Sequence, residues 1–285
     1  MARKSADYIV VSDIDGTLLQ AGYGVPRKNL DAIERFVFLG GRFTLCSGRS
    51  SESVGKLTEW VKLSAPAILC NGAYIYDYAT HEVIYSAPLA PSVREVTADI
   101  MAMFPHLGVE ITAEPNVYVP RMSSYIQDYT ASHHIRYTLC DLADIPVGWH
   151  KVVFTDNSET ILKLEEYVAR QSKNGGAFAE FNYVRTGPDM IEILARGISK
   201  ATGLQTLCDY LGIARSNSIA IGDYYNDIEL FRAAGIKISV ANAPADIRAM
   251  TDLTVAACLK GGVAQVLDSF DTIIGDDFEQ LTLDV

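Results

Sequence analysis

Short apolar runs alternate with amphipathic stretches towards both ends of the chain. The apolar runs are Tyr8–Val11, Arg42–Cys46, Ala67–Leu69 and Ser218–Ile221, and the amphipathic stretches lie around Arg27–Leu39, Ser51–Leu63 and Lys200–Leu211. Strands that alternate with helices in this way form parallel sheets with helices on both faces. The pattern therefore predicts an α/β fold with a doubly wound parallel sheet.

The pattern changes between Tyr85 and about Asp189. Helices are expected near Pro91–Phe104, Ser123–Ser132 and Glu159–Gln171, and extended segments at Gly108–Thr112, Val117–Pro120, Lys151–Thr155, Ala177–Tyr183 and Met190–Leu194. This irregular order of elements indicates a second, inserted α+β domain. We therefore predict a core formed by residues 1–84 and 190–285, and an inserted domain formed by residues 85–189.

The composition of the 285 residues is that of a soluble globular protein. Hydrophobic residues make up 49% and charged residues 21%, and no apolar run approaches the roughly 20 residues that cross a bilayer. The first residues carry only a four-residue apolar run before Asp13, so they do not resemble a signal peptide. We therefore expect a cytoplasmic protein.

The net charge of −11 argues against a nucleic-acid partner. The five cysteines are odd in number and widely spaced, so they match neither a disulfide framework nor a zinc site. The expected partner is a small-molecule substrate, with no nucleic acid and no membrane. We expect a monomer or a small homo-oligomer.

Two carboxylates, Asp13 and Asp15, directly follow the first apolar run. Burying a carboxylate is costly unless a cation or hydrogen bonds compensate it, so positive charge is expected at this strand end. Gly16 would let the backbone turn sharply, and Thr17 could hydrogen-bond an oxyanion or cap the following turn. A strand that simply ends in a polar turn is the alternative. Paired carboxylates at such a position, however, are typical of metal binding and phosphoryl transfer.

Other polar residues end later strands or begin the helices after them. They are Ser47, Gly48, Arg49, Lys200, Asp223, Asn226 and Asp227. Ser47 alone could be a helix N-cap, and Lys200 alone could be a solvated helix residue. In open α/β sheets, however, ligands bind outside the carboxyl ends of the strands. We therefore expect these distant residues to converge on one site.

Four segments of the chain contain these residues. In order, they resemble the motifs of the haloacid dehalogenase superfamily of phosphotransferases. Residues 13–17 match the first motif, Asp-x-Asp-Gly-Thr, and Ser47 matches the strand-terminal Ser or Thr of the second. Lys200 matches the lysine of the third, and residues 223–227 match the acidic fourth. The resemblance covers nearly the whole chain and implies a Rossmann-like core. The inserted domain and Cys70-Asn71-Gly72-Ala73 are similar to the cap and the Asn-Gly-Ala segment of the Cof-type sugar phosphatases, which carry a C2B-type cap.

The resemblance also implies roles in phosphoryl transfer. Asp13 is the expected nucleophile that forms an aspartyl-phosphate, and Asp15 is the expected general acid and then base. Ser47 and Lys200 would hold the transferring phosphoryl group, with the Gly48 N–H as an additional donor.

The expected cofactor is Mg²⁺, because the candidate ligands are all oxygens. Asp223 would bind the metal beside Asp13 and the Asp15 carbonyl. Asp227 is a further candidate metal ligand. Alternatively, Asn226 and Asp227 would orient the phosphate, the lysine or the waters of the metal.

Three arginines are candidate substrate ligands. Arg49 follows the second motif and either touches the substrate or pairs with an acid. Arg121 and Arg185 lie in expected loops of the inserted domain, where each could donate to hydroxyls or to an anionic group. A surface arginine is, by default, a solvated one.

The sequence predicts a Mg²⁺-dependent phosphatase of small phosphorylated metabolites, in particular sugar phosphates, acting through Asp13. One alternative is a hexose phosphomutase, which would return the phosphoryl group to its substrate. Another is a non-catalytic sugar-phosphate sensor, which the presence of every motif residue disfavours. A two-component receiver domain also forms an aspartyl-phosphate, but it is far shorter and has no cap.

Overall fold

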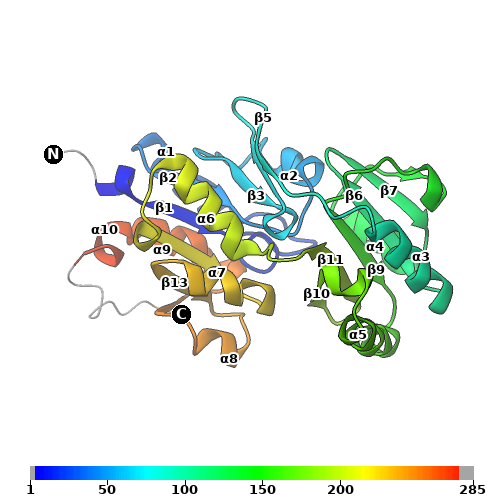
Figure 1. Cartoon of the computed structure of the whole chain (residues 1–285). Helices are drawn as coiled ribbons and strands as arrows, with labels where there is room; N and C mark the ends of the chain where they lie inside the picture. Colours follow the sequence, from blue (N-terminus) through cyan, green and yellow to red (C-terminus); the bar gives the residue numbers. More distant parts are fainter. Residues whose placement is uncertain (1–3, 276–285) are drawn as a thin grey trace. The chain divides into compact units, whose positions relative to one another are not determined.

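The computed structural model describes residues 4–275, which fall into two compact units (Figure 1). Of the described residues, the first unit contains residues 4–48, 55–85 and 199–275. The second contains residues 49–54 and 86–198. The short helix α2 (Ser51–Leu57) therefore begins in the second unit and ends in the first. Among the described residues, no helix is both long and apolar enough to cross a membrane.

The first unit is built on a parallel sheet with the strand order β14-β13-β12-β1-β2. Its strands are β1 (Ile9–Ser12), β2 (Arg42–Leu45), β12 (Ser218–Gly222), β13 (Ile236–Val240) and β14 (Leu253–Val255). Ser12 pairs with Ile221 on one side and with Leu45 on the other. The residues that follow these three strands therefore leave the sheet at the same edge.

Helices cover both faces of this sheet, which confirms the predicted doubly wound α/β fold. Ile9 and Val11 pack in one apolar cluster with residues of α6 (Lys200–Leu211) and α7 (Ile228–Ala233). Val10 points to the opposite face and is equally buried. The helices α1 (Arg27–Phe38) and α9 (Gly262–Asp268) pack against each other and contact β2 and β14, and none of their residues belongs to the first cluster.

Two expectations for the first unit were wrong in detail. The strand β3 (Ala67–Leu69) joins β4 (Tyr74–Asp77) and β5 (Glu82–Ser86) in a separate sheet, and it touches the main sheet through one bridge between Cys46 and Ile68. The helix α2 ends at Leu57 instead of Leu63. There the Trp60 N–H bonds to the Leu57 carbonyl, a tighter turn than an α-helix makes.

The second unit is an α+β body around a sheet with the order β10-β11-β9-β6-β7-β8. Its strands are β6 (Gly108–Ala113), β7 (Asn116–Arg121), β8 (Thr138–Leu139), β9 (Lys151–Thr155), β10 (Phe181–Gly187) and β11 (Met190–Ala195). Its helices are α3 (Val93–Met103), α4 (Ser124–Ser132) and α5 (Ser158–Lys173). Because β11 pairs with β9 and β10, this unit continues to residue 198, beyond the boundary at 189/190 expected from the sequence.

The segment Ala177–Glu180, which was expected to be extended, forms the 3₁₀ turn η4, and β10 begins only at Phe181. The chain reaches this turn through Gly175 and Gly176, both with positive φ. Such backbone suits glycine and ends the preceding α5 without starting a strand.

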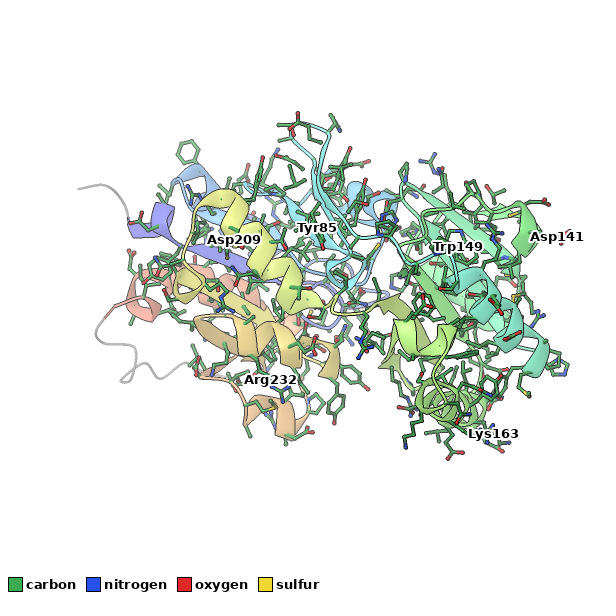
Figure 2. The ribbon with its side chains drawn as sticks, viewed as in Figure 1. Tyr85, Asp141, Trp149, Lys163, Asp209 and Arg232 are labelled. Atoms are coloured by element: carbon green, nitrogen blue, oxygen red, sulfur yellow. The ribbon has the colours of Figure 1, made fainter. Side chains whose placement is uncertain are left out.

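One face of the second sheet is apolar. Val109 and Ile111 of β6 pack there with Ile100 of α3, Leu164 of α5 and Trp149, which Figure 2 labels. Alternate residues along the strands point to the other face, which carries a buried polar cluster. We call its members, Glu110, Lys151 and Glu192, the second-unit charge cluster.

Candidate active site

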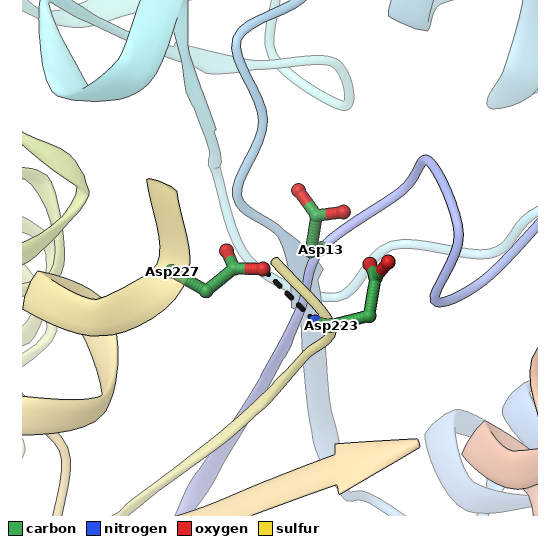
Figure 3. Close-up of side chains that lie close together, drawn as sticks. All are labelled: Asp13, Asp223 and Asp227. Atoms are coloured by element: carbon green, nitrogen blue, oxygen red, sulfur yellow. Dashed lines mark hydrogen bonds between the residues drawn. The ribbon is translucent and has the colours of Figure 1, made fainter. Parts of the chain in front are cut away.

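Three carboxylates meet where β1 and β12 leave the first sheet. One oxygen from each of Asp13, Asp223 and Asp227 lies within 4.8 Å of the others (Figure 3). The parallel register continues past the strand ends, because the Asp13 N–H donates to the Ile221 carbonyl at 2.8 Å. The backbone therefore brings together two segments that are about two hundred residues apart in the chain.

A buried lysine bridges two of these carboxylates. The Lys200 Nζ donates to Asp13 Oδ1 at 2.5 Å and to Asp227 Oδ1 at 2.7 Å. Lys200 is the first residue of α6, and the Ser199 hydroxyl caps this helix by accepting a hydrogen bond from the Thr202 N–H. The cap fixes where the helix begins and so where the lysine side chain starts.

Asp227 uses both of its oxygens on protein donors. One accepts from Lys200, and the other accepts from the backbone N–H groups of Asp223 at 3.0 Å and Tyr224 at 3.2 Å. A Cβ on Gly222 would lie 2.6 Å from the Asp227 carboxyl carbon, so only glycine leaves room for this arrangement. The geometry favours Asp227 as the group that orients the lysine and the loop over a direct metal ligand.

Asp223 is held by the first motif. The Thr17 hydroxyl donates to Asp223 Oδ1 at 2.7 Å, so Thr17 binds a carboxylate instead of a free oxyanion. Gly16 has a φ of +85°, and a Cβ there would lie 2.3 Å from Asp223 Oδ2. Asn242, which was not predicted from the sequence, also holds this motif, because its side chain donates to the Gly16 carbonyl at 2.8 Å. An asparagine in a loop after β13 carries no sequence signal for this contact.

The site holds more negative than positive charge. Burial raises the pKa of Asp13 well above its ordinary value, and the nearby Asp227, Asp223 and Asp15 raise it further against the pull of Lys200. Burial likewise raises the pKa of Asp223 from 3.8 to about 7. Burial alone would lower the pKa of Lys200, but Asp13 and Asp227 hold it well above its ordinary value.

This charge balance fits a divalent cation. Three buried carboxylates face a single ammonium, and buried carboxylates ionise readily only when further positive charge compensates them. Asp13 and Asp223 supply oxygen donors of the kind that Mg²⁺ prefers. The residues present therefore fit the expected metal.

Ser47 reaches the same sheet edge from β2. Its N–H donates to the Ile68 carbonyl at 2.9 Å, and its carbonyl accepts from the Asn71 N–H at 3.0 Å. Ser47 itself is buried. A Cβ on Gly48 would lie 3.0 Å from the Asn71 amide nitrogen, so Asn71 packs tightly on this loop.

Asp15 and Asn226 are the remaining residues that the sequence predicts for this site. Asp15 is exposed, and it lies near enough to Asp13 and Asp223 to raise the pKa of both. Asn226 is half-buried in the turn η6 (Tyr225–Asp227). Both positions are compatible with the expected roles, which remain predictions.

The three arginines have different surroundings, all within the second unit. Arg49 is buried, and its Nη1 donates to the Ser53 hydroxyl at 3.5 Å. Arg121 donates to the Met101 and Phe104 carbonyls, both at 3.0 Å, at the end of α3.

Arg185 donates to the Gly187 and Pro188 carbonyls and pairs with Glu165. Arg121 and Arg185 thus hold turns and helix ends of their own unit. Their role as substrate ligands stays a prediction.

Residues 10–267 match the family of haloacid dehalogenase-like hydrolases. The chain is 23% identical over 270 residues to the pyridoxal phosphate phosphatase YbhA of Escherichia coli (strain K12), covering 92% of this chain and 97% of that protein. It is 25% identical over 267 residues to the 5-amino-6-(5-phospho-D-ribitylamino)uracil phosphatase YitU of Bacillus subtilis (strain 168), covering 92% and 97%.

The fold is similar to that of a solved HAD subclass IIB sugar phosphatase. The TM-score is 0.78 at 19% identity, and the match covers 92% of this chain and 98% of that chain. Both units of this chain therefore have counterparts in proteins of known structure.

Proposed function

Because the chain belongs to the haloacid dehalogenase-like hydrolase family, we propose that it is a Mg²⁺-dependent phosphatase of small phosphorylated metabolites, in particular sugar phosphates, with Asp13 as its nucleophile. The observation that carries this proposal is the buried Lys200, which hydrogen-bonds Asp13 and Asp227 beside Asp223. Attack on a phosphate monoester requires a nucleophile beside positive charge that neutralises the phosphoryl oxygens. The Asp13 carboxylate lies beside a fixed ammonium and beside a second carboxylate that could bind a metal ion.

The first chemical step transfers the phosphoryl group to the protein. An Asp13 oxygen forms a bond to phosphorus while the bond from phosphorus to the ester oxygen breaks. The Lys200 ammonium and the Ser47 hydroxyl hold the phosphoryl oxygens, and Asp15 gives its proton to the leaving oxygen.

The second step returns the protein to its starting state. Asp15, now a carboxylate, takes a proton from water, and the water oxygen bonds to phosphorus as the bond to Asp13 breaks. Asp13 and Asp223, with the Asp15 carbonyl, would hold Mg²⁺, which when bound neutralises charge on the phosphoryl oxygens. Lys200 needs no proton transfer in either step, in agreement with its raised pKa.

The names of the similar proteins support the substrate class in general terms. They include a pyridoxal phosphate phosphatase, a phosphoribitylaminouracil phosphatase and a sugar phosphatase. These substrates are all phosphate monoesters of small organic groups, and the organic groups differ. We propose that the second unit acts as the cap that selects the leaving group.

The test is release of inorganic phosphate by the purified protein from a panel of hexose, pentose, nucleotide and cofactor phosphates with Mg²⁺. We expect turnover that excess chelator stops and added Mg²⁺ restores. Absence of phosphate release from every ester, with or without Mg²⁺, would contradict the proposal. Isomerised hexose phosphate without phosphate release would instead identify a phosphomutase.

A further inference from the structure

An asparagine in the turn after β13 connects two segments of the first unit. The Asn242 amide group donates to the Gly16 carbonyl at 2.8 Å, and its Oδ1 accepts from the Cys258 N–H, also at 2.8 Å. One partner is an acceptor and the other is a donor, so the two bonds fix the orientation of the amide. Asn242 therefore holds the Gly16 carbonyl in one place relative to Cys258.

The two peptide groups that flank Gly16 are both hydrogen-bonded. The Gly16 N–H donates to the Leu19 carbonyl at 2.8 Å, and Asn242 binds the Gly16 carbonyl. A trans peptide group is planar and its carbonyl points away from its N–H, so the bond to Leu19 also sets the direction of the Asp15 carbonyl. That carbonyl is an expected metal ligand, and Gly16, with a φ of +85°, joins it to the peptide group that Asn242 holds.

The Asn242 bond restrains the more weakly held of these two peptide groups. In the Gly16–Thr17 peptide group, the Thr17 N–H makes only a long bond of 3.4 Å to the Ile14 carbonyl. Glycine populates left-handed and right-handed backbone conformations almost equally, so this peptide group could rotate about Gly16 if it were not held. The 2.8 Å bond from Asn242 opposes that rotation.

The same loop also holds Asp223, one of the clustered carboxylates in Figure 3. The Thr17 hydroxyl donates to Asp223 Oδ1 at 2.7 Å, and the Gly16 backbone lies so close that a Cβ there would be 2.3 Å from Oδ2. A rotation of the Gly16–Thr17 peptide group would disturb both contacts. It would therefore reach two expected oxygen ligands of the metal at once, the Asp15 carbonyl and the Asp223 carboxylate.

We propose that Asn242 is a positioning residue for the metal: it holds the Asp15 carbonyl and the Asp223 carboxylate in the arrangement that binds Mg²⁺. The inference rests on the proposed function, because it concerns the metal site of that reaction. Ser47 and Lys200 reach the site from β2 and α6, and neither is bonded to Asn242. Loss of Asn242 should therefore weaken the metal and leave the binding of the phosphoryl group intact.

An Asn242 variant should fold, because the rest of the loop has an anchor of its own. Asn29 donates to the Leu18 carbonyl at 3.2 Å and accepts from the Ala264 N–H at 2.9 Å. Asn242 itself is exposed, so shortening its side chain leaves no cavity in the core. The substitution should change the Gly16 end of the loop only.

The test compares Asn242→Ala and Asn242→Asp with the control Asn217→Ala. Asn217 donates to the Asp7 carbonyl at 3.2 Å and accepts from the Ser216 hydroxyl at 3.2 Å. It lies in the same unit but precedes β12, at the end of that strand opposite to the carboxylates. The control therefore removes a similar pair of bonds away from the site.

Four quantities are measured for each protein. They are the Mg²⁺ affinity from the rise in Tm during a Mg²⁺ titration, the Mg²⁺ concentration for half-maximal turnover of p-nitrophenyl phosphate, kcat at saturating Mg²⁺, and hydrogen exchange of the Thr17 amide without metal. The first and the last do not depend on activity.

For Asn242→Ala we expect about tenfold weaker Mg²⁺ binding, a similar increase in the Mg²⁺ concentration for half-maximal turnover, and faster exchange of the Thr17 amide. The kcat at saturating Mg²⁺ should stay within about threefold of the wild type, because Ser47 and Lys200 keep their positions. Asn217→Ala should match the wild type in every measurement.

Asn242→Asp separates the lost bond from a change in charge. Its carboxylate still accepts from the Cys258 N–H but has no N–H to donate to the Gly16 carbonyl. An added negative charge by itself would strengthen Mg²⁺ binding. We nevertheless expect weaker binding, because the Gly16–Thr17 peptide group is no longer held.

Wild-type Mg²⁺ affinity in Asn242→Ala, or stronger Mg²⁺ binding by Asn242→Asp, would overturn the inference. A large loss of kcat at saturating Mg²⁺ with an unchanged Mg²⁺ affinity would also overturn it. If Asn242→Ala does not fold, Asn242→Asp decides alone. A wild type that binds Mg²⁺ but hydrolyses no ester would contradict the proposed function instead, and the Tm titration would still decide the role of Asn242.

Discussion

Each unit of this protein buries a lysine among carboxylates, and the two clusters differ in ways that distinguish the candidate active site of the first unit from the charge cluster of the second. In the first unit Lys200 contacts Asp13 at 2.5 Å and Asp227 at 2.7 Å. In the second unit Lys151 lies 3.6 Å from Glu192, with Glu110 close enough to interact electrostatically. Both lysines are about 1% exposed, so burial alone does not distinguish the two clusters.

The position of the cluster on the sheet is the first difference. Asp13 follows a strand end and Lys200 starts a helix, so backbone N–H groups and turns surround the site. Glu110 and Glu192 lie within strands, where their backbone groups are committed to pairing with β9. Groups at strand ends can face a ligand, whereas groups inside a sheet mainly face their neighbours.

The charge balance is the second difference. Burial raises the pKa of Glu110 in the second unit and the pKa of Asp13 in the first. The first unit also contains Asp223, a third carboxylate beside Asp13 and Asp227, and burial raises its pKa to about 7. In the second unit one lysine faces two carboxylates, and among residues 4–275 Glu110 Oε2 has no hydrogen-bond partner. Excess charge at a strand end therefore distinguishes the candidate active site better than burial of charge as such.

The largest effect should come from removing one carboxylate charge in each cluster. Asp13→Asn keeps the shape and removes the attacking charge, so turnover of p-nitrophenyl phosphate should fall at least about a thousandfold. Glu192→Gln makes the same chemical change in the second unit and should leave that turnover within about threefold of the wild type. Steady-state kinetics of both variants decide, and comparable losses would erase the distinction between the clusters.

The same two variants should differ in stability. Glu192→Gln leaves Lys151 with a poorer partner and should cost about 3 kcal/mol of unfolding free energy. Asp13→Asn removes a carboxylate whose charged form the fold disfavours, so the metal-free protein should be as stable as the wild type or more so. Urea unfolding in the presence of chelator measures both. A large stability loss in Asp13→Asn would mean that its charge stabilises the fold.

Metal binding should depend only on the carboxylate cluster of the first unit, Asp13, Asp223 and Asp227. Asp223→Ala should weaken Mg²⁺ binding at least about tenfold, because it removes an oxygen ligand. Glu110→Gln, which alters a buried carboxylate of the second unit, should leave Mg²⁺ affinity unchanged. A titration of thermal stability against Mg²⁺ reports both, and equal affinities in the two variants would place the metal elsewhere.

The smallest expected effect is a pH dependence of the stabilisation by Mg²⁺. The folded metal-free protein holds a proton on Asp223 up to about pH 7, whereas the unfolded chain loses it near 3.8. The Asp223 contribution to metal-free stability therefore decreases as the pH rises through this window, and Mg²⁺ must displace that proton. The Mg²⁺-induced rise in Tm should be larger at pH 8 than at pH 5.5. A rise independent of pH in this range would show that Asp223 is ionised throughout.

The local pattern of apolar residues was sufficient to predict the strands that carry the candidate site. The runs around Ile9–Ser12 and Ser218–Gly222 predicted the parallel strands, and the strand-end rule predicted that Asp13 and Asp223 would meet. The strand Ile236–Val240 was not predicted, although its alternating residues carry a strand signal.

The partners of individual side chains could not be predicted in the same way. Asp227 could have oriented phosphate, lysine or metal, and the structure places Lys200 on it because α6 begins beside the strand ends. Arg121 looked available in the sequence, but the carbonyls at the end of α3 bind it.

The stereochemical course of hydrolysis at phosphorus tests directly whether Asp13 is the nucleophile. A substrate whose phosphoryl group is made chiral with oxygen isotopes would be hydrolysed by the wild-type protein, and the configuration of the transferred group would be analysed. Attack by Asp13 followed by attack of water gives two in-line displacements, so net retention is expected. Net inversion would show that water attacks the substrate directly and would contradict the role of Asp13 as the nucleophile.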